Sequence, residues 1–156
     1  MRKTLAIVAT AALATIVVAS IVSASSKHEL VTQPVTIRVI EHATTDVVAD
    51  TGKRGDSPGD ILTWHNKIFD GDNAKQVGRD QGECVRINPD EGTWECRWTT
   101  WVPGGAITVE GPFYDTHDNV IAITGGKGNF ANARGTMQIK ARHGGTEYAF
   151  IFHVLP

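Results

Sequence analysis

The sequence predicts an all-β domain whose strands form either an antiparallel sandwich or a closed barrel. After residue 34, eight segments with strand character follow one another, and turn-forming residues separate them. The chain of 156 residues contains 16 glycines, and beyond residue 34 it has no stretch typical of a long helix. Both observations favour one antiparallel domain over residues 35–156.

The residues before this domain are interpreted as a targeting segment. A basic start at Arg2-Lys3 precedes a long uncharged apolar stretch, and Val22-Ser23-Ala24 is typical of a cleavage site. We therefore expect a signal peptide over residues 1–24 and a flexible lead-in over residues 25–34. The competing interpretation is an uncleaved membrane anchor. After cleavage, no stable membrane span is expected, and the domain is predicted to be secreted to an extracellular or periplasmic compartment.

The first half of the domain is predicted as four strands with one long loop. Residues 35–41 alternate apolar and polar side chains, as half-buried strands do. Residues 43–58 are dense in turn formers and predict a long connection. Three strands follow, of which the first is rich in apolar and aromatic residues and the last two are joined by a five-residue hairpin loop, Asn88–Gly92. These strands are residues 61–69, 77–87 and 93–102.

The second half is predicted as four further strands. Pro112 predicts a strand end or an edge position. The glycine-rich residues 125–133 are predicted as a connection with one helical turn, and residues 143–146 as the turn of the last hairpin. The strands are residues 106–111, 120–124, 134–142 and 147–155.

The two cysteines are predicted to form a disulfide. An exported chain enters an oxidising compartment, where paired thiols are usually oxidised. Counting back from the five-residue hairpin loop places Arg86 opposite Trp94 and Cys84 opposite Cys96. Directly opposite residues of an antiparallel pair are close enough for a disulfide. The geometry therefore predicts a cross-strand bridge between Cys84 and Cys96.

Composition and motifs argue against several functions. The net charge of −2 and the pI of about 6.3 give no reason to expect a nucleic-acid partner. After residue 24 the serines are Ser25, Ser26 and Ser57, and none lies in the nucleophile motif of a serine hydrolase. The six histidines lack the spacing of a metal site, so no metal is predicted.

The tryptophans mark one face of the hairpin. Trp94 and Trp98 share a face with Arg86 and both cysteines, because strand side chains alternate. This face is either a packed core or the wall of an aromatic-ligand site. A tryptophan-lined lumen can be both at once.

Several segments form a pattern through their order and spacing. They are Gly59-Asp60-Ile61-Leu62, Asn66-Lys67-Ile68-Phe69-Asp70-Gly71-Asp72, Gly82-Glu83-Cys84-Val85, Thr108-Val109-Glu110-Gly111-Pro112-Phe113 and Ala122-Ile123-Thr124-Gly125-Gly126-Lys127-Gly128-Asn129-Phe130. Together these segments resemble allene oxide cyclases. Val77-Gly78-Arg79-Asp80-Gln81-Gly82 and Ala133-Arg134-Gly135 are similar to the related dirigent proteins. The resemblance covers residues 59–155.

The resemblance implies an eight-stranded antiparallel closed β-barrel with a mostly apolar lumen, often a homotrimer, that needs no metal or organic cofactor. The plant cyclase steers ring closure of an unstable fatty-acid epoxide, and dirigent proteins steer coupling of phenoxy radicals. Both act on a reactive intermediate through a shaped pocket.

The resemblance also assigns residues. The glutamate that stabilises developing positive charge falls on Glu41, the asparagine that holds the epoxide-side water on Asn66, and a cavity cysteine on Cys84. The chain departs from the cyclase pattern at Ala43, where the cyclase has asparagine, and at Phe113, where it has tyrosine.

The sequence therefore predicts a cofactor-free cyclase, isomerase or stereo-directing protein for a small apolar or phenolic reactive intermediate. The expected catalytic residues are Glu41 and Asn66. The expected substrate-binding residues are Trp94, Trp98, Phe113, Tyr114 and Arg86. The alternatives are a non-catalytic, lipocalin-like carrier and a secreted structural or effector barrel with a filled lumen.

Overall fold

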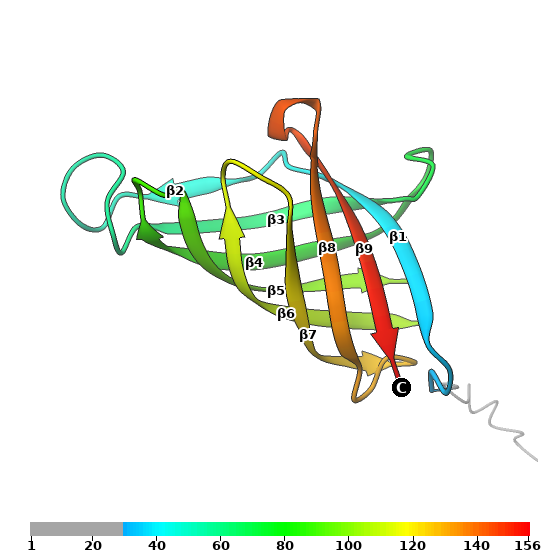
Figure 1. The fold of residues 1–156 in the computed structure, drawn as a ribbon. Coiled ribbons are helices and arrows are strands. Elements are labelled where there is room, and N and C mark those ends of the chain that lie inside the picture. The colour runs from blue at the N-terminus through cyan, green and yellow to red at the C-terminus, as the bar shows by residue number, and fades with distance from the viewer. Residues whose placement is uncertain (1–29) are drawn as a thin grey trace, which may run out of the picture.

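The computed structural model describes residues 30–156, which form a closed antiparallel β-barrel (Figure 1). The predicted signal peptide and the start of the lead-in lie outside the described residues. The barrel strands are β1 (Val35–His42), β3 (Ile61–Asp70), β4 (Gln76–Asn88), β5 (Thr93–Val102), β6 (Gly105–Tyr114), β7 (Asn119–Gly128), β8 (Arg134–Arg142) and β9 (Glu147–Leu155). A short strand, β2 (Val47–Ala49), lies beside β3. The predicted eight-stranded barrel is confirmed.

The barrel closes through β1. From β3 to β9 each strand pairs with the next along the chain, and β9 then pairs with the whole of β1. The second half of β1, from Val39 to His42, also pairs with the end of β3. Because β1 is bonded on both sides there, no sheet edge remains at that point of the wall.

β2 corrects one prediction. The sequence predicted an uninterrupted loop over residues 43–58, but β2 continues the line of β1 along the same edge of β3. β1 and β2 are thus one strand with an interruption at residues 43–46. Three residues are too few to show an alternation of side chains, so no sequence pattern predicts β2.

Two more strand ends differ from the prediction. β6 continues through Pro112 to Tyr114, with Pro112 paired to β5, while the ladder to β7 ends at Glu110. β7 continues through the glycines up to Gly128, and residues 129–132 form turns, not a helical turn. A Cβ at Gly126 would lie 2.4 Å from the carbonyl oxygen of Phe130, so the strand needs glycine here for close backbone packing. A strand that is rich in glycine for this reason has the same composition as a loop.

The hairpin of β4 and β5 has the predicted register at its centre. Cys84 pairs with Cys96 and Arg86 with Trp94, and the two cysteines form the predicted disulfide. Nearer the turn, Asn88 rather than Ile87 pairs with Thr93, because the ladder is irregular between Arg86 and Asn88. The bulge shortens the loop by one residue without moving the cysteines.

One half of the lumen is a packed apolar core. Alternate side chains of each strand point inward and fill the end of the barrel where both β1 begins and the chain ends (Figure 1). Its fully buried members include Ile68, Ile107, Val109, Met137, Phe152 and Val154. Burial of each such side chain contributes about 1.5–3 kcal/mol. Within residues 30–156, no helix is long and apolar enough to cross a membrane.

Candidate functional site

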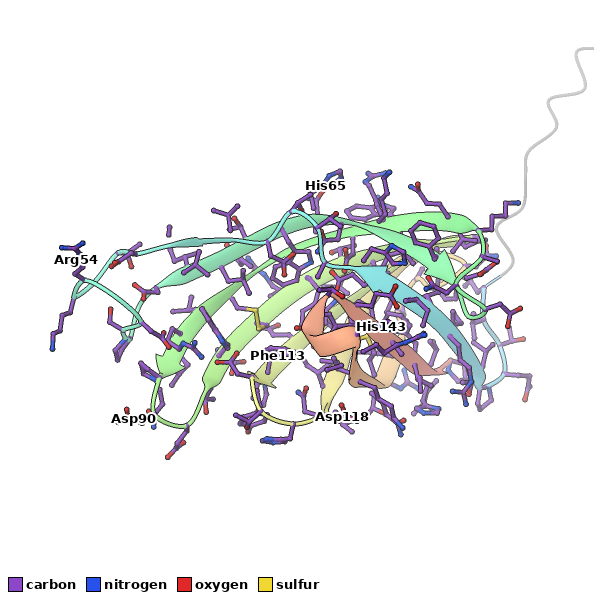
Figure 2. The ribbon with its side chains drawn as sticks, turned by 90° about the horizontal axis from the view of Figure 1, so that it is seen from above. Arg54, His65, Asp90, Phe113, Asp118 and His143 are labelled. Atoms are coloured by element: carbon purple, nitrogen blue, oxygen red, sulfur yellow. A yellow bond between two sulfur atoms is a disulfide. The ribbon has the colours of Figure 1, made fainter. Side chains whose placement is uncertain are left out.

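The opposite end of the lumen contains a narrow pocket with a cavity volume of about 60 Å³, part of it open to solvent. It is bounded by the end of β1, the interruption after it and the adjoining ends of β3–β6, β8 and β9. Figure 2 views this region from above and labels Phe113, which lies near the disulfide and near the β8–β9 turn with His143. The lining residues are Glu41, Asp46, Leu62, Trp64, Cys84, Cys96, Trp98, Phe113, Ile139, Tyr148 and Phe150.

Asn66 organises the polar side of this pocket. Its side chain is almost fully buried, and its Nδ2 donates to Glu41 Oε1 at 2.9 Å and to Asp46 Oδ1 at 2.7 Å. Its Oδ1 accepts from the backbone N–H of Thr44 and from the N–H and hydroxyl of Thr45. The amide therefore uses both donors and its acceptor. One side chain shapes the strand interruption and places a carboxyl group on either side of it.

A second buried carboxyl group lies next to this cluster. Asp80 pairs with Asn66 across the β3–β4 ladder and is fully buried. It interacts with Glu41 and with the indole of Trp64, but neither of its oxygens has a partner of full hydrogen-bond geometry. A buried carboxyl with so few donors is costly to ionise.

The two carboxyl groups have raised pKa values. Burial raises the pKa of Asp80 to about 7, and the charge of Asp46 adds to this effect. Burial, followed by the charge of Asp80, raises the pKa of Glu41 well above its usual value, against the lowering effect of the hydrogen bond from Asn66. The pair therefore keeps protons at pH values where exposed carboxyls are fully ionised.

Tyr148 supplies the one phenol of the lining. It pairs with Glu41 across the β1–β9 ladder, and its ring meets that of Phe113 edge-on at 6.0 Å between centroids. Burial, and next the negative charge of Glu41, raise the pKa of its hydroxyl above 10. Tyr148 therefore stays a neutral hydrogen-bond donor.

Three of the residues proposed from the sequence for catalysis or substrate binding line this pocket, and a fourth, Asn66, is connected to it through Glu41. Glu41 and Asn66 are hydrogen-bonded to each other, and Trp98 and Phe113 form part of its aromatic wall. The disulfide is part of the same wall.

Arg86 and Trp94 lie in a separate cluster beside the pocket. The guanidinium of Arg86 donates to both carboxylate oxygens of Asp56, at 2.7 and 2.9 Å, and to Asp115 at 2.6 Å. Its centre lies 3.9 Å from the centroid of Trp94, whose Nε1 also donates to Asp115. This clamp ties the β2–β3 loop to the β6–β7 loop, and Arg86 has little left to offer a ligand.

Tyr114 lies at the rim. Its ring stacks on His117 at 4.5 Å in a surface groove formed by the β6–β7 loop and the β8–β9 turn. Its neighbour Phe113 points into the lumen because side chains alternate along β6.

Three further residues of this site, Asp46, Asp80 and Tyr148, are not predicted from the sequence. Strand parity carries a signal for Asp80, which lies four residues before the inward-facing Cys84. The same argument applies to Tyr148, two residues before the buried Phe150. Asp46 lies in the strand interruption and has no local signal. Among residues 30–156, no group of three or more His, Cys, Asp or Glu side chains is arranged to hold a metal ion.

Solved structures share this barrel. A pyocyanin demethylase is 26% identical, with a TM-score of 0.65 over 76% of this chain and 98% of that chain. A pterocarpan synthase dirigent protein is 18% identical, with a TM-score of 0.61 over 78% and 86% of the two chains. An exo-specific intermolecular Diels-Alderase is 11% identical, with a TM-score of 0.64 over 78% and 96%. The last two show a common fold.

The family comparison covers most of the barrel. The allene oxide cyclase family model matches residues 33–152, from the residues just before β1 into β9. The matched range contains every residue of the pocket. The chain therefore belongs to the allene oxide cyclase family.

Proposed function

We propose that the pocket binds a small apolar or aromatic reactive intermediate and directs its cyclisation or isomerisation, without a cofactor. The observation that carries this proposal is Glu41: a buried carboxyl with a raised pKa, fixed by Asn66, in a pocket whose other walls are largely aromatic and aliphatic. Family membership supports a cyclase or stereo-directing role.

Glu41 acts as the proton donor and acceptor of the reaction. Its raised pKa keeps the proton at pH values where an exposed carboxyl has lost it, which suits general acid–base catalysis. A cyclisation or isomerisation conserves atoms, so a proton given to one atom of the substrate is returned from another. Asn66 is a positioning residue, because it holds the Glu41 carboxyl by a hydrogen bond and is not itself part of the pocket lining.

The aromatic wall acts by shape. Trp64, Trp98, Phe113 and Phe150 restrict the conformations of a bound intermediate and exclude water. The relatives named above as a demethylase, a pterocarpan synthase and a Diels-Alderase all act on small organic molecules, which supports use of the same cavity.

We further propose that the domain is secreted after loss of residues 1–24 and assembles as a homotrimer. The disulfide fits an oxidising compartment. Intact mass and native mass spectrometry of the secreted protein test both points.

Product stereochemistry tests the proposed function. An aryl ortho-quinone methide with a pendant hydroxyl group and an allene oxide ester both cyclise spontaneously to racemic products. With wild-type protein we expect an enantiomeric excess for at least one probe, measured by chiral chromatography. Glu41→Gln should lower the catalysed rate by about 10²–10⁴-fold, while tryptophan fluorescence still reports binding.

The matched control is Glu110→Gln, which removes one carboxylate from an exposed position of β6. It should behave as wild type. Racemic product from both probes despite ligand binding would contradict the proposal and favour a lipocalin-like carrier. Failure of every small ligand to bind would favour a structural or effector barrel.

A further inference from the structure

The charge of the pocket is one-sided. Glu41 and Asp46 line it and Asp80 lies directly behind Glu41, whereas none of its lining residues is Lys, Arg or His. Arg86, the basic residue nearest on β4, is held by two aspartates. A bound anion would therefore meet carboxyl groups and no paired cation.

Basic groups at the neighbouring turn are also held by a carboxylate. Arg142 and His143 lie 3.8 and 3.6 Å from Glu147. His42 also lies 3.5 Å from Glu147, so this one carboxylate occupies the basic groups nearest the turn.

The walls of the pocket present aromatic rings. The rings of Trp64 and Trp98 lie 5.7 Å apart in an edge-on arrangement, and Phe150 lies 5.9 Å from Trp98. Tyr148 and Phe113 form a second edge-on pair. Aromatic faces attract cations, and the effect increases where water is excluded.

We propose that the pocket selects planar aromatic cations, such as N-alkylated or protonated nitrogen heterocycles, over neutral and anionic molecules of the same shape. This inference rests on the proposed function in one respect, because it takes the same cavity as the site. It names a substrate class that the resemblance did not imply, since a fatty-acid epoxide carries a carboxylate.

Binding of such a cation is coupled to a proton. The groups that face Glu41 are Asp80 from β4, Asp46 from the strand interruption and Tyr148 from β9. Burial and the charge of Asp80 favour the protonated form of Glu41, and a nearby cation favours the ionised form. The complex should therefore release a proton that a neutral ligand does not displace.

Three bicyclic probes of similar shape test the selectivity: 1-methylquinolinium, 1-methylnaphthalene and 1-naphthoate. Calorimetry with the oxidised protein at pH 7 gives the affinities, and repetition in two buffers of different ionisation enthalpy gives the protons released. We expect 1-methylquinolinium to bind about tenfold more tightly than 1-methylnaphthalene, and 1-naphthoate more weakly than both. Proton release should accompany the cation only.

Variants assign the effect to the acidic side chains. Asp46→Asn and Glu41→Gln should each lower the ratio of the cation affinity to the 1-methylnaphthalene affinity from about tenfold towards one. Glu41→Gln should also abolish the proton release. Glu110→Gln, with the same change of net charge on the outer face, should change neither.

Equal affinities for the cation and the neutral probe, or tightest binding of 1-naphthoate, would overturn the charge selectivity and leave the pocket itself intact. A charge effect that Glu110→Gln removes as fully as Asp46→Asn would also overturn it. Failure of all three probes to bind would instead contradict the proposed function, because the cavity would not accept small aromatic molecules.

Discussion

Two clusters of ionisable side chains, one around Arg86 and one around Glu41, lie near the same end of the barrel and differ in how their charges are paired. In the Arg86 clamp, a nearly buried guanidinium meets two aspartates, so charge and hydrogen bonds are balanced. In the Glu41 cluster, carboxyl groups face one amide and each other, with no basic partner among the described contacts. A balanced cluster holds two loops together, whereas an unbalanced one keeps capacity for a proton or a ligand.

The balanced cluster should carry the larger share of stability. Arg86→Ala should lower the free energy of unfolding by about 2–3 kcal/mol, because it removes three charge-assisted hydrogen bonds and the stacking on Trp94. The expected loss of stability is limited because Asp56 and Asp115 are about half exposed and remain solvated. Urea unfolding measures the effect.

Arg86→Lys is the control for this prediction. Lysine keeps the charge but cannot pair in two places with Asp56, so the loss should be intermediate. Hydrogen exchange should speed up in the β2–β3 loop first. An unchanged midpoint for Arg86→Ala would mean that the clamp contributes nothing to the fold.

In the Glu41 cluster, removal of a carboxyl charge should raise the free energy of unfolding at high pH. Because the folded pKa of Asp80 is raised to about 7, above its unfolded value, the folded state binds the proton more tightly. The stability that the protonated Asp80 contributes is fully present below about pH 4 and is lost as the pH rises through about 7.

Asp80→Asn removes the free-energy cost of a buried ionised carboxylate at high pH, because asparagine stays neutral. We expect the variant to be more stable than wild type by about 1–2 kcal/mol at pH 8, with little difference at pH 4. The pKa of Glu41 should fall in the same variant, because the second carboxyl charge is gone. Thermal unfolding at the two pH values tests the sign, and a variant less stable at pH 8 would contradict it.

The smallest effect is expected at the rim. Phe113 and Tyr114 are adjacent, but Phe113 lines the pocket and Tyr114 stacks on His117 outside it. Tyr114→Ala should change ligand affinity by less than about twofold, whereas Phe113→Ala should weaken it by about tenfold. Titration of 1-methylquinolinium compares them, and equal losses would show that the rim takes part in binding.

Most of the barrel could be predicted from the sequence, because strand alternation and hairpin register are local signals. Alternation marked the strands, and counting from Asn88–Gly92 paired Cys84 with Cys96 even though a bulge at Ile87 shortened the loop. The glycines up to Gly128 predict a connection although they belong to β7, because close backbone packing and a loop use the same residue.

The site was less readable for a different reason. Parity tells which face of a strand a residue occupies but not its depth along the barrel, so Arg86 was grouped with Trp98. The β2–β3 loop that supplies Asp56 folds back over Arg86 through contacts 30 residues apart in the chain, which no local pattern records. Asp46 depends in the same way on Asn66, 20 residues later.

The interruption between β1 and β2 separates two design problems. Residues 43–46 take no part in the β1–β3 and β2–β3 ladders, and Thr44, Thr45 and Asp46 are exposed, yet Asp46 borders the pocket. The four positions can therefore be varied as a short cassette that changes which molecules enter, while the paired strands of the barrel keep their sequence. A library confined to this cassette, with Asn66 retained as its anchor, is the economical route to new ligand preferences on this scaffold.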